Sequence, residues 1–182
     1  YGPQGTGLLL CGGEALPLLQ GGTGSESLRQ EMPDFLPDRL EAGTHNVLGI
    51  AGLAAGIDFV RAQRTERILL HERQLLRRAG EGMGRISRVS CFLARDEKRQ
   101  AGVLSFTVSG MQPEQVAEQM ASRGIALRAG LHCAPFAHRT AGTLPDGTVR
   151  MSLSAFNRAF EIDAMLFALR EVAAACGRGE IS

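Results

Sequence analysis

The sequence predicts an α+β protein, of mixed helix and strand, in which helices cover a small β-sheet. Short runs rich in β-branched and aromatic residues alternate with segments of helical periodicity in the second half of the chain. Glycine makes up 23 of the 182 residues and marks the tight turns between these segments. The mean hydropathy is −0.03 and 44% of the residues are apolar, which is typical of a globular protein that buries a core.

The charge balance argues against two classes of partner. The 20 basic and 19 acidic residues give a net charge of +1, so there is no electrostatic basis for generic binding to nucleic acid or to a membrane surface. No stretch approaches about 18 apolar residues, and no basic segment precedes the short apolar run near the N-terminus. We therefore expect a cytoplasmic protein with no nucleic-acid or membrane partner.

The first half of the chain predicts short strands, tight turns and one long helix. The apolar run 6–11 lies between glycines and indicates a buried strand. A buried, apolar helix should begin near Asn46, become amphipathic near Arg61 and stop at the glycines of segment 80–84. This change of character indicates a domain boundary. The expected domains are residues 1–61 and 62–182.

The second half predicts the order β-β-α-β-β-α. Strands are expected over 86–93, 102–108, 125–128 and 148–154, and helices over 113–124 and 159–176. Pro113 suits the first position of its helix. The loop 129–147 joins the last two strands, and loops of this length in compact domains are often functional.

This loop contains a candidate nucleophile, Cys133. Positive groups at His132 and Arg128 would lower the pKa of its thiol, and Pro135 favours a shaped, exposed turn. The alternative is a small buried apolar residue. A zinc site formed by His132, Cys133 and His138 is weaker, because adjacent ligands rarely converge on one ion and no fourth ligand has a suitable spacing.

The remaining cysteines carry no motif. The four cysteines lie 42 or more residues apart, so there is no CxxC pair of the kind found in zinc ribbons and thioredoxins. Reduced thiols are the expected state. Cys11, Cys91 and Cys176 lie in apolar or helical settings and are expected to pack in the core.

Two further positions suit anions. Gly43 and Thr44 precede the long helix, where backbone amides and a hydroxyl would bind phosphate. Capping of that helix by Thr44 or Asn46 explains the same residues without a ligand. Arg150 lies in an apolar strand, and its planar fork suits a carboxylate. The alternative is an exposed arginine on an edge strand.

Four segments together resemble the cysteine desulfurases of the class V aminotransferase group. They are YGPQGTGLL (1–9), FLPDRLEAGTHNVLGIAGLAAGIDF (35–59), RAGLHCAP (128–135) and GTVRMSLSAFN (147–157). The RxGxHCA form resembles the branch of SufS-type and selenocysteine-lyase-like proteins. The resemblance implies the C-terminal part of a fold-type I pyridoxal-phosphate transferase. Residues 1–61 would end the large cofactor-binding domain, and residues 62–182 would form the small domain.

The resemblance also implies roles for the site residues. Cys133 matches the cysteine that accepts sulfur from L-cysteine as a persulfide, with release of alanine. Arg150 matches the arginine that binds the substrate carboxylate. Arg128 and His132 match positions next to the substrate.

Pyridoxal 5'-phosphate is the cofactor that the resemblance implies. Thr44, beside Gly43, matches a threonine that reaches the cofactor phosphate of the neighbouring subunit, which implies a homodimer. L-cysteine or selenocysteine would be the substrate, and a sulfur-acceptor protein a further partner. The family's Schiff-base lysine precedes the segment that resembles Tyr1, whereas this chain contains only Lys98. We therefore expect a C-terminal portion of a desulfurase, inactive alone.

Two other interpretations remain open. One is a class V transaminase or lyase without sulfur transfer, against which Cys133 argues. The other is a dimerisation or regulatory domain that inherited the fold and lost the lysine. A His-Lys segment encoded upstream would argue against the second.

Overall fold

The computed structural model describes residues 1–26 and 28–178, with side chains described up to residue 176. They form two compact units, unit 1 over Tyr1–Arg64 and unit 2 from Thr65 onward. The division falls close to the predicted change of character at Arg61. That the units correspond to a large and a small domain remains a prediction.

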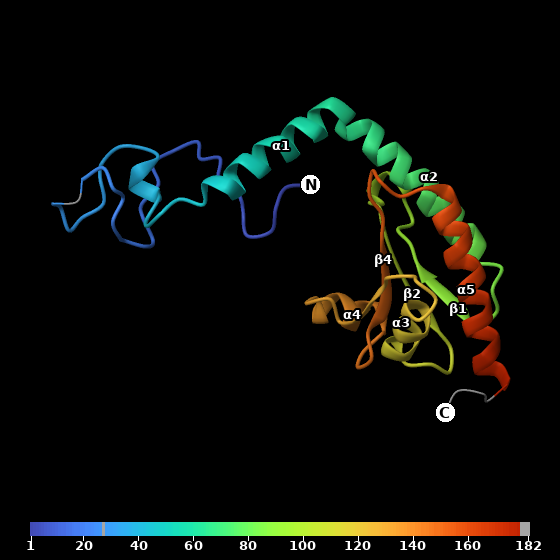
Figure 1. Ribbon diagram of the computed structural model, residues 1–182. Coiled ribbons are helices and arrows are strands. Elements are labelled where there is room, and N and C mark those ends of the chain that lie inside the picture. The colour runs from blue at the N-terminus through green and yellow to red at the C-terminus, as the bar shows by residue number, and fades with distance from the viewer. Residues whose placement is uncertain (27, 179–182) are drawn as a thin grey trace. The chain divides into compact units, whose positions relative to one another are not determined.

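Unit 1 is mostly irregular backbone, followed by the short 3₁₀ helix η1 (Asp38–Leu40) and the helix α1 (Val47–Gln63) (Figure 1). The strand predicted over 6–11 is wrong, because no strand of the described part of the unit pairs with this segment. The side chains of Leu8, Leu9 and Leu10 are exposed. Cys11 is exposed as well, so its predicted core position is also wrong.

The glycines of α1 allow the first residues of the chain to pack closely on this helix. A Cβ atom at Gly52 would lie 2.5 Å from Pro3, and one at Gly56 would lie 2.9 Å from the backbone of Tyr1. The ring of Tyr1 also lies 5.2 Å from that of Phe59. The small residues of this helix therefore make room for backbone within unit 1.

The single long helix of the prediction is two helices in the structure. α1 ends at Gln63, and α2 (Thr65–Met83) follows Arg64, whose φ of +68° interrupts the helical backbone. The predicted stop at the glycines is also wrong in part, since α2 continues through Gly80 and Gly82. A Cβ atom at Gly82 would collide with Leu166, so this glycine serves helix packing.

Unit 2 contains a four-stranded antiparallel sheet in the order β1-β2-β4-β3. Its strands are β1 (Val89–Phe92), β2 (Val103–Val108), β3 (Arg128–Gly130) and β4 (Thr148–Ser152). The connections contain η2 (Glu97–Arg99), α3 (Pro113–Ala121) and α4 (Pro135–Ala141), and α5 (Ala159–Arg178) follows β4. The predicted element order and the α+β class are confirmed.

Two details of this half differ from the prediction. The third strand begins at Arg128, where the predicted strand ends, and the loop 129–147 contains the helix α4. No helix within the described ranges combines the length and the apolar character needed to cross a membrane.

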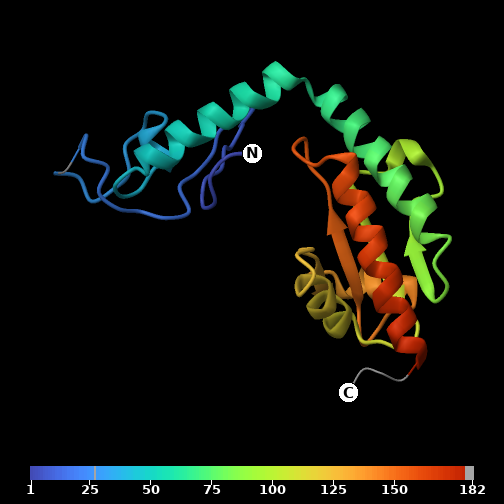
Figure 2. The ribbon, with the colours of Figure 1, turned by 45° about the vertical axis from the view of Figure 1, so that its right-hand side comes forward.

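Helices pack on one face of the sheet. α5 lies over the sheet and contacts both α2 and α3 (Figure 2). Leu104, Phe106 and Val149 are fully buried between the sheet and these helices. Because side chains alternate along a strand, the neighbours of Val149, including Arg150, point to the opposite face. Cys91 and Cys176 are only half-buried at the margin of this core.

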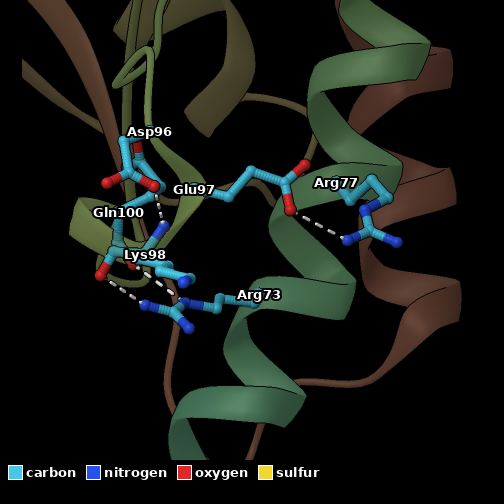
Figure 3. Close-up of polar contacts among 6 residues, drawn as sticks. All are labelled: Arg73, Arg77, Asp96, Glu97, Lys98 and Gln100. Carbon is cyan, nitrogen blue, oxygen red and sulfur yellow. Dashed lines mark hydrogen bonds and ion pairs between the residues drawn. The ribbon is translucent and has the colours of Figure 1, made fainter.

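The connection between β1 and β2 is fixed to α2 (Figure 3). Arg73 donates hydrogen bonds to the carbonyl oxygens of Lys98 (2.7 Å) and Gln100 (3.2 Å), and Arg77 pairs with Glu97 at 3.1 Å. Lys98, the only lysine of the chain, therefore lies beside β1, whereas β3 forms the other edge of the sheet.

Candidate functional site

Two arginines face each other on the sheet surface away from the helices. β4 lies between β2 and β3, so the alternative of an edge-strand position for Arg150 is wrong. Its Cα partner in β3 is Arg128. Directly opposite residues of an antiparallel pair place their side chains on one face, with Cβ atoms roughly 5 Å apart. The sheet thus brings two guanidinium groups together.

Among the described residues, the two arginines have no counter-ion. Nε of Arg150 is buried without a hydrogen-bond partner in the described part of the chain. No carboxylate of the described residues forms an ion pair with Arg128 or Arg150. A buried donor left unpaired costs about 1–3 kcal/mol, and like charges in direct opposition add to that cost. An anion placed between the two side chains would relieve both penalties.

Cys133 lies on a strained turn directly after β3. His132 has a φ of +51° and Cys133 a φ of +59°, which side-chain-bearing residues rarely adopt and which costs about 1 kcal/mol or more each. The turn is closed by a hydrogen bond from the Ala134 amide to the Leu131 carbonyl oxygen (2.9 Å), and α4 begins at Pro135. The thiol is exposed, in contrast to the buried apolar residue of the alternative.

A close backbone approach ties this turn to β4. Gly147 has a φ of +84°, and a Cβ atom there would collide with the carbonyl group of Gly130. Only glycine permits this contact without displacement of the strands. The close contact fixes the start of the turn of Cys133 against the strand that carries Arg150.

The surroundings of His132 lower its pKa and leave one ring nitrogen unbonded. Its Nε2 lies 3.1 Å from the carbonyl oxygen of Thr148, and its Nδ1 is buried without a partner among the described residues. Burial lowers the pKa of His132, the hydrogen bond to Thr148 opposes this, and the charges of Arg150, His138 and Arg128 lower it further. Its positive charge, expected from the sequence, is therefore disfavoured at neutral pH.

A second histidine, which the sequence indicates only as a weak zinc ligand, lies against His132. His138 of α4 is buried, and its ring centroid lies 5.9 Å from that of His132. Its Nδ1 is 2.7 Å from the hydroxyl oxygen of Thr143. The signal available in the sequence was its position five residues after Cys133 and three after a helix-starting proline.

The predicted phosphate-binding residues belong to unit 1. Asn46 caps α1, since its side chain accepts a hydrogen bond from the amide of Gly49 at 3.0 Å. Gly43 has a φ of +93°, and its amide donates to the carbonyl oxygen of Gly22. The hydroxyl of Thr44 is not the cap and makes no hydrogen bond in the described ranges, so its predicted phosphate contact remains a prediction.

Comparison with known proteins gives one consistent result. The family described as Aminotransferase class-V matches residues 1–165. The chain is 37% identical over 179 residues to a probable cysteine desulfurase of Mycolicibacterium paratuberculosis. The aligned region covers 95% of this chain and 26% of that protein. It is 34% identical over 181 residues to a probable cysteine desulfurase of Methanothermobacter thermautotrophicus, covering 94% of this chain and 44% of that one.

Solved structures agree with these relatives. The apo cysteine desulfurase of Thermococcus onnurineus superimposes with a TM-score of 0.77 at 33% identity, covering 87% of this chain and 40% of that one. A cysteine desulfurase of Escherichia coli gives a TM-score of 0.72 at 26% identity, covering 87% and 38%. The chain thus spans less than half the length of the proteins that it matches.

Proposed function

Because the chain belongs to the class V aminotransferase family of pyridoxal-phosphate enzymes, we propose that it is part of a cysteine desulfurase whose nucleophile is Cys133. One observation carries this proposal. An exposed thiol lies on a strained turn directly after β3, the strand whose Arg128 faces Arg150, and the described residues offer these two arginines no counter-ion. The similarity to proteins named cysteine desulfurases supports the same reading. Such an exposed thiol argues against a transaminase without sulfur transfer.

Arg150 binds the substrate in this proposal. Its buried Nε and the terminal nitrogens form a planar fork that matches the α-carboxylate of L-cysteine or selenocysteine. Arg128, directly opposite, adds a second positive charge. The substrate carboxylate would act as the counter-ion of both arginines. Its binding would relieve the repulsion between the two guanidinium groups and give the buried Nε of Arg150 a hydrogen-bond partner.

Cys133 performs the sulfur transfer. Its thiolate attacks the sulfur of the substrate, so that a bond forms between the two sulfur atoms while the substrate carbon–sulfur bond breaks. Bound pyridoxal phosphate supplies the electron sink for the electron pair left on the substrate. Protonation then gives alanine, and Cys133 retains the sulfur as a persulfide. Because this side chain is exposed, the persulfide is accessible to a sulfur-acceptor protein.

Thr44 is the residue of this chain proposed to bind the cofactor. Its hydroxyl has no hydrogen bond in the described ranges and fits a phosphate oxygen, which in the proposed homodimer belongs to the neighbouring subunit. Lys98 does not suit the Schiff base, since it lies beside β1 while Cys133 follows β3. We assign that lysine to protein outside this sequence. The four free cysteines fit a cytoplasmic location.

The proposal is tested with the full-length protein. Cys133→Ala is expected to abolish alanine release from L-cysteine and persulfide formation while cofactor binding is retained. The persulfide is detected by mass spectrometry on the tryptic peptide 129–139, whose only cysteine is Cys133. Cys11→Ala is the matched control, because Cys11 is also exposed but lies in unit 1. Alanine release by Cys133→Ala at the rate of the control would refute the assignment.

A further inference from the structure

We propose that unit 2 contains a second binding site, for a small aliphatic carboxylate, between α2 and the connection that joins β1 to β2. Residues of α2 and of segment 93–100 line a cavity of about 480 Å³ there. Small-molecule sites have volumes of roughly 300–1,000 Å³. β1 and β3 form opposite edges of the sheet, and Cys133 follows β3. The cavity is therefore separate from the proposed site of sulfur transfer and does not depend on it.

The apolar part of the lining contains a glycine at a position where a helix favours a larger residue. Leu76 and Gly80 belong to α2, and Leu93 follows β1. A Cβ atom at Gly80 would lie 3.2 Å from Cδ1 of Leu93 and 4.0 Å from Cδ1 of Leu104. Leu93 is 47% exposed and can shift, so packing does not require this glycine as it requires Gly82. Glycine is unfavourable inside a helix, and here it leaves space for an aliphatic chain.

Three guanidinium groups also line the cavity, those of Arg73, Arg77 and Arg95. Arg77 pairs with Glu97, whereas Arg73 and Arg95 form no ion pair with any described residue. Arg73 donates to two carbonyl oxygens from Nε and Nη2 (Figure 3), and its Nη1 makes no hydrogen bond within the described ranges. A carboxylate would accept hydrogen bonds from this Nη1 and from the planar fork of Arg95.

The charges of the lining favour an anion over a cation. The lining contains three arginines and two glutamates. Glu97 is compensated by Arg77 at 3.1 Å, which leaves Arg73 and Arg95 against Glu81. Glu81 is exposed, so water screens its repulsion of a bound anion in part. Removal of its charge should therefore strengthen the binding of a carboxylate.

The wall opposite α2 is held in place by hydrogen bonds within the protein. Oε1 of Gln100 accepts a hydrogen bond from the amide of Ala94 at 2.7 Å, and Nε2 of Gln100 donates to the carbonyl oxygen of Val103 at 2.7 Å. The hydrogen bonds of Arg73 join the same connection to α2. The cavity thus exists without a ligand, so little ordering entropy opposes binding.

The test measures the affinity of octanoate for the full-length protein by isothermal titration calorimetry. Arg95→Gln removes one of the two uncompensated guanidinium groups, and Gly80→Leu fills the space beside Leu93. The matched control is Arg99→Gln, which changes the net charge by the same amount. Arg99 is exposed, belongs to η2 and is not among the lining residues.

We expect Arg95→Gln to weaken octanoate binding about fivefold and Gly80→Leu to weaken it about tenfold or more. Arg99→Gln should leave the affinity unchanged, and Glu81→Gln should raise it about twofold. Equal losses in Arg95→Gln and Arg99→Gln would overturn the site, and weaker binding by Glu81→Gln would overturn the assignment to a carboxylate. Because Arg95 is exposed, its variant decides the matter even if Gly80→Leu does not fold.

The location of the bound molecule needs its own measurement, because Arg128 and Arg150 would also accept a carboxylate. An aliphatic carboxylate that carries a diazirine is photo-crosslinked to the full-length protein, and the labelled tryptic peptides are identified by mass spectrometry. We expect label on the peptides 79–85 and 89–95, which contain Gly80 and Leu93, and its loss when octanoate is in excess. Label confined to other peptides, or no binding of octanoate at all, would overturn the proposal.

Discussion

At the residue scale, the proposed function makes the substrate carboxylate the counter-ion of the opposed arginines Arg128 and Arg150. Arg150→Lys keeps the charge but loses the planar fork, so we expect binding of L-cysteine to weaken about tenfold or more, which corresponds to about 1.4 kcal/mol. The effect should appear in KM of the full-length protein. Arg139→Lys on the exposed face of α4, where Arg139 lies over the ring of Phe136, is the control. Identical KM values for both variants would contradict the assignment.

His132 gives the stability of the protein a dependence on pH. Its pKa in the folded state is lowered from 6.5, so below that value the unfolded chain binds the proton more readily than the folded chain. The stability that the neutral ring of His132 contributes is complete above pH 6.5 and is lost as the pH falls through the lowered pKa. Urea unfolding at about pH 7.5 and about pH 5.5 measures the difference. His132→Asn should reduce it, and an unchanged difference would contradict this account.

The chemistry of single residues could be predicted from the sequence where neighbours in the chain carry it. Cys133 stands out because His132, Arg128 and Pro135 are close in sequence. The opposition of Arg128 and Arg150 could not be predicted, because it depends on the register of β3 against β4. The neutral state of His132 depends on burial, which the sequence does not show.

At the element scale, the contact between α2 and α5 depends on a missing side chain. A Cβ atom at Gly82 would collide with the side chain of Leu166, and both residues are buried. We expect Gly82→Ala to lower the free energy of unfolding by about 1–3 kcal/mol, as overpacking of a core does. Chemical denaturation of the chain measures this. Gly84→Ala is the control, because its Cβ atom would lie 3.4 Å from its nearest neighbour. Equal losses in both variants would argue against the packing role.

The elements of unit 2 could be predicted because apolar residues alternate with polar ones along its strands and recur with helical periodicity along its helices, which indicates the buried face of each element. The errors have local physical causes. The apolar run 6–11 has the composition of a strand but no partner in the described part of unit 1. Helical periodicity continues across Arg64, whose positive φ separates α1 from α2. α4 is too short for a periodic signal, so the loop 129–147 reads as irregular.

At the scale of the whole chain, the two units differ in how much they bury. Every large apolar side chain of the buried core belongs to unit 2, from Leu75 to Val172. In the described part of unit 1, Leu8, Leu10 and Leu48 are 67%, 87% and 87% exposed, although the sequence predicts a buried strand and a buried helix there. Exposed apolar surface of this extent is typical of an interaction site, as the proposed function expects for unit 1.

This difference predicts how the two units behave when they are separated. Residues 65–182 contain the whole sheet and its covering helices, so this segment is expected to fold alone and to unfold cooperatively in urea. Residues 1–64 have no comparable core and should show a gradual transition, because the entropy of ordering the chain exceeds what little burial returns. Circular dichroism across a urea titration measures both. Cooperative unfolding of 1–64 would contradict the view that its apolar residues need a covering domain, and a gradual transition of 65–182 would contradict the independence of unit 2.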